Sequence, residues 1–138
     1  MIRRDARAVW KGSIQEGGGT LRSRSLDHPY SFATRFGDEE GTNPEELIGS
    51  ALAGCFAMAL SLGLGEAGHD PESVDARATV SLDPEALAIT TIELEVEGSV
   101  PGMDAEAFRR AAEEAKENCP VSKALAGVDI VLKEARLA

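Results

Sequence analysis

Residues 47–64 read LIGSALAGCFAMALSLGL, and this apolar run decides the fold. Immediately before it, residues 42–46 (Thr-Asn-Pro-Glu-Glu) supply a capping residue, a proline at the first helical position and acids in the first turn. That combination is typical of a helix start. We therefore predict one long helix to about Ala67, with Gly68 as its stop. Because the run is apolar nearly all round, this helix should be buried on most of its faces.

The flanking sequence alternates with a period of two residues, which predicts strands. We expect, in order, strands near Arg3–Trp10, Thr20–Ser25 and Tyr30–Arg35, the long helix, strands at Val74–Leu82 and Ala88–Val96, a helix from Asp104 to about Glu117, a short helix after Pro120, and a strand at Asp129–Ala135. This order, βββαββααβ, indicates an α+β fold with a mostly antiparallel sheet around a long central helix. The length of 138 residues suits a single domain, 1–138.

The long helix also bears on the oligomeric state. A helix this apolar needs cover on every side, and six short strands supply few layers. Two copies that pack their long helices together would cover it, so we expect an intimate homodimer with an isologous interface.

Composition and charge limit the function classes. The net charge of −10, with 28% charged residues, indicates a soluble acidic protein and argues against nucleic-acid binding, which needs clustered basic residues. The first residues, MIRRDARAVWKGS, lack the apolar core of a secretory signal. The apolar run contains glycines and serines and begins beside two glutamates, so a buried helix is favoured over a membrane span. We expect a cytoplasmic protein.

The chain has two cysteines, both in settings that favour reactivity. Cys55 lies in the middle of the apolar run, and Cys119 begins a predicted short helix in residues 118–122, Asn-Cys-Pro-Val-Ser. Exposed N–H groups at a helix start favour a thiolate at Cys119. One thiol that attacks and one that resolves are the minimum for reversible thiol redox chemistry. The alternative is that both are small buried apolar residues. Sequence spacing cannot establish the 4.4–6.8 Å Cα separation that a disulfide requires.

A thiolate at Cys55 needs a positive charge from outside its helix, because the field of a helix dipole is confined to the first turn. Arg35 is the strongest candidate, since it ends a predicted strand just before the loop that leads into the helix. Its guanidinium could lower the pKa of the thiol and hold the oxygen of an oxidant. Arg22 and Arg24 are the alternatives. A plain surface arginine is the other interpretation of Arg35.

Glu45 is the natural partner to orient Arg35, because a salt-bridged pair fixes the direction of the guanidinium donors. The ten positions between Glu45 and Cys55 correspond to roughly 15 Å along a straight helix. The two therefore cannot touch within one helix. Either the second helix of a dimer brings Glu45 to the Cys55 of its neighbour, or Arg35 spans the gap. Glu45 could alternatively serve only the helix dipole.

Other site patterns are weak. Residues 17–19, Gly-Gly-Gly, lack the context of a phosphate loop and favour a flexible hairpin turn. His28 and His69 both fall in predicted turns, and no His, Cys or acid group has the spacing of a zinc site. We therefore expect no metal site.

Four segments resemble one known family: Thr34-Arg35-Phe36; residues 41–49, GTNPEELIG; residues 55–61, CFAMALS; and residues 118–122, NCPVS. The chain is similar to the OsmC/Ohr family of osmotically inducible and organic-hydroperoxide-resistance proteins. Residues 64–68 (LGEAG), residues 80–83 (VSLD) and Val121 place the resemblance nearer the OsmC branch. The resemblance covers essentially the whole chain, with the motifs in the same order.

This resemblance implies a thiol peroxidase that needs no cofactor and reduces organic hydroperoxides, and hydrogen peroxide more weakly, in oxidative and osmotic stress defence. It implies an interlocked α/β dimer with its sites at the subunit interface. Cys55 matches the peroxidatic cysteine and Cys119 the resolving one, while Glu45 matches the glutamate that holds the catalytic arginine. Arg35 matches that arginine in the OsmC-type pattern. An external dithiol would restore the reduced cysteines.

Two other functions remain open from the sequence. The first is a non-catalytic dimer that binds a small molecule in an apolar pocket, with its cysteines merely buried. The second is a general thiol–disulfide oxidoreductase, which the lack of a Cys-x-x-Cys pair disfavours.

Overall fold

The long predicted helix is α2, Pro44–Glu66, and both of its predicted end signals are present. At its start the Asn43 side chain accepts a hydrogen bond from the Glu46 N–H at 2.8 Å, and Pro44 takes the first helical position. Just past its end, Gly68 adopts a φ of +86°, a left-handed conformation that favours glycine. By length and composition α2 could also cross a membrane, a test that the core helix of a soluble protein passes too.

The computed structural model describes residues 1–138 and divides them into two compact units, Met1–Leu47 and Ile48–Ala138. The boundary falls within the first turn of α2. The prediction of a single domain over 1–138 stays a prediction, and the two units are described in turn.

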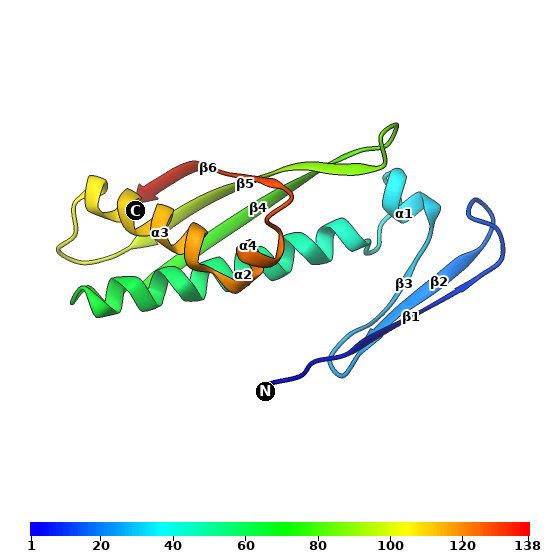
Figure 1. The fold of residues 1–138 in the computed structure, drawn as a ribbon, viewed down its shortest axis with the longest axis horizontal. Helices are drawn as coiled ribbons and strands as arrows, with labels where there is room; N and C mark the ends of the chain where they lie inside the picture. The colour runs from blue at the N-terminus through cyan, green and yellow to red at the C-terminus, as the bar shows by residue number, and fades with distance from the viewer. The chain divides into compact units, whose positions relative to one another are not determined.

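The first unit contains a three-stranded antiparallel sheet in the order β1-β2-β3 (Figure 1). Its strands are β1 (Ala6–Lys11), β2 (Gly18–Ser23) and β3 (Asp27–Tyr30). The first two predicted strands, Arg3–Trp10 and Thr20–Ser25, correspond to β1 and β2 with shifted ends. The glycines at 18 and 19 belong to β2 and not to the turn, which instead occupies residues 12–17.

The prediction of a strand at Tyr30–Arg35 is wrong for most of its length. β3 ends at Tyr30, and a short helix, α1 (Phe32–Phe36), follows. The cause is a reciprocal cap: the Ser31 hydroxyl accepts the N–H of Thr34 at 3.2 Å, and the Thr34 hydroxyl accepts the N–H of Ser31 at 2.9 Å. Two backbone donors are thereby satisfied only if the chain turns. Arg35 consequently lies in the last turn of a helix and not at the end of a strand.

The second unit pairs helices with a three-stranded sheet in the order β4-β5-β6. Its elements are the remainder of α2, β4 (Ser73–Asp83), β5 (Ala88–Ser99), α3 (Ala105–Asn118), α4 (Pro120–Ala124) and β6 (Asp129–Leu137). The strands β4 and β5 form the predicted antiparallel hairpin, whereas β6 runs parallel to β5 after the α3–α4 crossover. The α+β class with mostly antiparallel strands is confirmed.

The core of this unit lies between one face of the sheet and the helices. Alternate residues of β5 face inward, and α2 contributes one stripe at helical spacing. In Figure 1, α2 runs beside the β4–β5 hairpin and α3 lies next to β6. The buried apolar side chains include Leu52, Phe56, Leu60 and Leu64 of α2, Ile92, Leu94 and Val96 of β5, and Phe108 of α3.

The opposite stripe of α2 is uncovered by the rest of the second unit. Met58 is 76% exposed and Leu62 is 64% exposed, and the small residues Ala51 and Gly54 continue the same stripe. Only 28% of the most apolar 18-residue stretch of α2 is buried. The expected burial of α2 on most faces is therefore not achieved within one chain.

Gly98 of β5 provides a sharp test of the core. A Cβ atom at this position would lie 2.6 Å from two ring carbons of Phe108, whereas a Cβ at Gly127 would meet nothing within 4 Å. We predict that Gly98→Ala lowers the free energy of unfolding by about 1–3 kcal/mol, because the ring must shift within a packed core. Gly127→Ala is the control, with an expected change within about 0.5 kcal/mol. Urea unfolding measures both; equal effects would contradict this account of the core.

Candidate functional site

The structure brings the two cysteines together, although 64 positions separate them in the sequence. Cys55 is half-buried on α2, and Cys119 is fully buried where α3 ends and α4 begins. Both are free thiols, and each shifts the pKa of the other, so the two side chains lie close enough to interact. The fold therefore places side by side the two thiols that a reversible disulfide would join.

The surroundings of the two sulfurs shift the pKa values of the two thiols in opposite directions. Burial raises the pKa of the Cys55 thiol, and so do the hydrogen bond with Cys119 and the negative charge that Cys119 can carry. Burial would also raise the pKa of Cys119, but Cys55, the backbone and hydroxyl of Ser122 and the backbone of Val121 lower it overall. Within residues 48–138 the pair therefore holds a negative charge preferentially on Cys119.

Cys55 opens into an apolar groove between α2 and α3 with a volume of about 830 Å³. The methionines Met58 and Met103 contribute to its walls, together with alanines from both helices. Its charged residues are Glu66, Arg110 and Glu114. A volume of this size suits a small organic molecule, and the apolar lining favours an oily one.

Arg35 and Glu45 form an ion pair in the first unit, as the sequence predicted. The Arg35 Nε donates to Glu45 Oε1 at 2.8 Å, and Glu45 is only 8% exposed. The second carboxylate oxygen, Oε2, is buried without a hydrogen-bond partner. The Arg35 guanidinium also lies over the Phe36 ring, 5.3 Å from its centroid. The guanidinium is thus held by its Nε edge, and its terminal nitrogens form no other hydrogen bond within residues 1–47.

Asn43 fixes the position of this ion pair, a role that the sequence did not reveal. Its side-chain nitrogen donates to the Thr34 carbonyl at 3.0 Å, while its side-chain oxygen caps α2 by accepting the Glu46 N–H. One amide therefore joins α1, which carries Arg35, to the start of α2, which carries Glu45. The capping residue was predicted, but its bond to Thr34 was not.

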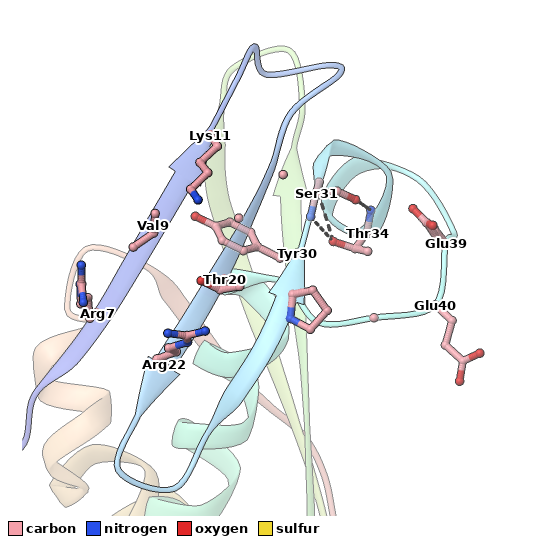
Figure 2. A pocket seen from close by; sticks show the side chains of 14 residues that line it. Arg7, Val9, Lys11, Thr20, Arg22, Tyr30, Ser31, Thr34, Glu39 and Glu40 are labelled. Atoms are coloured by element: carbon pink, nitrogen blue, oxygen red, sulfur yellow. Dashed lines mark hydrogen bonds between the residues drawn. The ribbon is translucent and has the colours of Figure 1, made fainter.

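A second cavity, of about 780 Å³, lies over the sheet of the first unit (Figure 2). Figure 2 shows Arg7 and Lys11 on β1, Arg22 on β2 and Tyr30 on β3, with the hydrogen bonds of the Ser31 cap at its side. No cysteine lines it. Arg22, an alternative to Arg35, pairs instead with the exposed Asp27 at 3.2 Å.

The four predicted site residues form two separate pairs, and neither pair belongs to a metal site. No three His, Cys, Asp or Glu side chains lie together as a metal site would require. Of the four predicted site residues, the structure joins Cys55 with Cys119 in one unit and Arg35 with Glu45 in the other. Ser122 was not predicted, although its place three residues after the helix-start cysteine is the spacing at which a side chain can reach back to a cap.

Comparison with known proteins agrees with this arrangement. Residues 37–133 match the family described as OsmC-like protein. The chain is 51% identical over 129 residues to Peroxiredoxin OsmC of Escherichia coli strain K12, which covers 90% of each chain. Peroxiredoxin OsmC of Shigella flexneri matches to the same extent.

Solved structures share the fold. The OsmC-like protein of Mycoplasma pneumoniae superposes with a TM-score of 0.75 at 19% identity, covering 99% of each chain. The organic hydroperoxide resistance protein OhrB of Bacillus subtilis gives a TM-score of 0.65 at 25% identity, covering 94% of this chain and 97% of its own. With paired thiols on a long helix and a short one, and with relatives alike over nearly its whole length, this chain belongs to the OsmC family.

Proposed function

We propose that this chain is a cysteine-based thiol peroxidase that reduces organic hydroperoxides, and hydrogen peroxide more weakly, in oxidative and osmotic stress defence. The observation that carries this proposal is the pairing of the Cys55 and Cys119 thiols at an apolar groove. The 51% identity to a protein named Peroxiredoxin OsmC and the likeness to an organic hydroperoxide resistance protein support it.

The bonds that form and break in this reaction involve the peroxide, these two sulfurs and an external dithiol. The Cys55 thiolate attacks the distal peroxide oxygen, the O–O bond breaks, and the alcohol leaves with a proton, so that Cys55 becomes a sulfenic acid. The Cys119 thiolate then attacks the Cys55 sulfur and expels water once the hydroxyl oxygen is protonated. The disulfide that forms is reduced by an external dithiol, which supplies two electrons and two protons.

Arg35 is the cation that we assign to the attacking thiol. Burial and Cys119 raise the pKa of Cys55, and no cation of residues 48–138 offsets this rise, so an attacking thiolate at neutral pH needs a further positive charge. The guanidinium of Arg35 is already held by the buried Glu45, with its terminal nitrogens available to a peroxide oxygen. Glu45 orients this cation and does not itself touch the substrate.

A homodimer completes the site in this proposal. The uncovered stripe of α2 carries Met58 and Leu62, two residues that also line the groove beside Cys55. A second copy packed on this stripe would cover the apolar surface and close the groove around an oily peroxide. We also propose that residues 1–138 act as one domain and that the protein works in the cytoplasm without a cofactor.

The first test is peroxide consumption by three proteins. Wild type should consume cumene hydroperoxide faster than hydrogen peroxide, because the groove is apolar. Cys55→Ser should abolish turnover, since the attacking sulfur is lost. Cys119→Ser should complete one oxidation and then stall or over-oxidise. Thiol titration after one equivalent of hydroperoxide should show the loss of two thiols per wild-type chain, reversed by dithiothreitol.

If the number of free thiols is unchanged after the hydroperoxide is added, the peroxidase proposal is wrong, and a protein that only binds a small molecule is supported. Faster reduction of a protein disulfide than of a peroxide would instead support a general oxidoreductase. Equal rates with the two peroxides would contradict the preference for an oily substrate.

The second test identifies the arginine. Arg35→Met should raise the pKa of Cys55, and each unit of increase reduces the thiolate fraction near pH 7 by about tenfold. Because the thiolate returns once the pH exceeds the raised pKa, the rate deficit should narrow as the pH increases. Arg22→Met and Arg24→Met are the matched controls and should stay near wild type. A pH-rate profile for each variant decides; if Arg22→Met or Arg24→Met shows the loss instead, the assignment to Arg35 is wrong.

The third test concerns the dimer. Gly54 is exposed and a Cβ atom there would meet nothing within 4 Å, so we expect the protomer to tolerate Gly54→Leu. If a second α2 packs on this stripe, the added side chain should separate the two helices and weaken association. Sedimentation equilibrium should give twice the chain mass for wild type and for the control Gly127→Leu, and a shift toward the single chain for Gly54→Leu. A wild-type protein that sediments as one chain would refute the dimer.

A further inference from the structure

Ser122 lies on α4, three residues beyond Cys119, and its side chain is almost completely withdrawn from solvent. The residue is 9% exposed, and its hydroxyl oxygen is fully shielded. A serine in a helix usually satisfies its hydroxyl on a backbone carbonyl one turn earlier, but this hydroxyl forms no standard hydrogen bond. A buried hydroxyl without a partner is costly, so its surroundings should explain it.

The Cys119 sulfur supplies that explanation. Cys119 is the N-cap of α4 and Ser122 its third residue, the spacing at which the two side chains can meet, and the Ser122 hydroxyl lowers the pKa of Cys119 without forming a full hydrogen bond. The two observations agree if the neutral thiol is a weak acceptor and the thiolate a strong one. The hydroxyl is then unsatisfied only while Cys119 is protonated, and it gains a partner when charge forms on that sulfur.

The backbone holds this arrangement in place. The Cys119 N–H donates to the Ala115 carbonyl at 3.0 Å, and the Cys119 carbonyl accepts the Lys123 N–H at 3.1 Å. Cys119 is thereby tied to α3 on one side and to α4 on the other. Ser122 is carried by the same short helix, so the hydroxyl and the sulfur keep their relative position without any change in the chain.

The two sulfurs differ in their access to solvent. Cys119 is 0% exposed, whereas Cys55 is half-buried and lines the groove. An external thiol that approaches a Cys55–Cys119 disulfide through the groove meets the Cys55 sulfur first. The sulfur that it does not attack must accept the displaced electron pair, and a stabilised thiolate is the better leaving group.

We propose that Ser122 is a positioning residue whose hydroxyl stabilises Cys119 as the leaving thiolate when a reductant attacks the Cys55 sulfur of the disulfide. This inference rests on the proposed peroxidase function and assigns the direction of its reductive half. The hydroxyl is carried by the same short helix as the atom on which charge develops, so little movement of the chain is needed at the moment of reaction.

The steps balance as follows. A thiolate of the external dithiol attacks Cys55 Sγ, the Cys55–Cys119 bond breaks, and its electron pair remains on Cys119 Sγ. The second thiol of the reductant, as its thiolate, attacks the reductant sulfur of the mixed disulfide. Cys55 then leaves as a thiolate, and the reductant becomes a cyclic disulfide. The two protons released by the dithiol are taken up by the two cysteine sulfurs as they return to the resting state.

Mapping of the mixed disulfide tests the direction of attack in the wild-type protein. Protein oxidised with one equivalent of cumene hydroperoxide is treated with 2-mercaptoethanol, and free thiols are trapped with N-ethylmaleimide. Peptide mass analysis should find mercaptoethanol on Cys55 and maleimide on Cys119. Mercaptoethanol on Cys119, or an equal distribution between the two, would overturn the proposal.

Variants test the hydroxyl itself. Reduction of the preformed disulfide by dithiothreitol should slow about tenfold or more in Ser122→Ala, the size expected when a hydrogen bond to a charged group is lost. Single-turnover oxidation by the peroxide should slow far less. Ser122→Thr retains a hydroxyl and should recover most of the rate. Ser81→Ala, the same change at an exposed position of β4, is the control.

A third readout separates positioning from folding. In the Cys55→Ser background only Cys119 titrates as a thiol, so its thiolate absorbance reports its pKa directly. Adding Ser122→Ala should move that titration to higher pH, because a donor to the thiolate is lost. An unmoved titration, together with an unchanged reduction rate, would leave Ser122 as a packing residue. If wild-type protein fails to consume peroxide at all, the proposed function fails, whereas the titration still decides whether Ser122 stabilises the Cys119 thiolate.

Discussion

Burial of one stripe of α2 against the β4–β5–β6 sheet is the constraint on which the rest of the second unit depends. Leu52, Phe56, Leu60 and Leu64 recur at the spacing of a helix face, and each is completely buried. Cys55 directly precedes Phe56, so it stands at the edge of this stripe and is covered only in part. The packing that stabilises α2 therefore also places the Cys55 sulfur at the border between the core and the groove.

Because Cys55 and Cys119 interact, a single thiolate charge can lie on either of the two sulfurs. Donors from α4 favour the charge on Cys119, whereas at Cys55 the one favourable contribution within residues 48–138, from the Val121 backbone, is outweighed by burial and by Cys119. A guanidinium beside Cys55 would reverse this preference, and the oxidative and reductive halves of a peroxidase cycle need the charge on different sulfurs. Separate donors for the two sulfurs would meet that need without a large movement of the chain.

The sequence was sufficient for the elements with strong local signals. The start of α2 at Pro44 and its stop at Gly68 were predictable because capping and glycine preferences act within a few residues. It failed at α1, because the cap between Ser31 and Thr34 uses a threonine where glutamate or glutamine is usual, and the alternating side chains around it suggested a strand. The closeness of Cys55 and Cys119 depends on the crossover through α3, which no local pattern encodes.

The amide of Asn43 carries a further meaning for the first unit. It bonds to the Thr34 carbonyl with one arm and caps α2 with the other, so α1 and the first turn of α2 share a single clamp. A chain that lost this clamp would keep every charged atom of the Arg35–Glu45 pair and yet present its guanidinium at a variable angle. The loop therefore determines the orientation of the guanidinium and not its charge. Replacement of the uncharged Asn43 would make the orientation of Arg35, eight residues away in the sequence, less well defined.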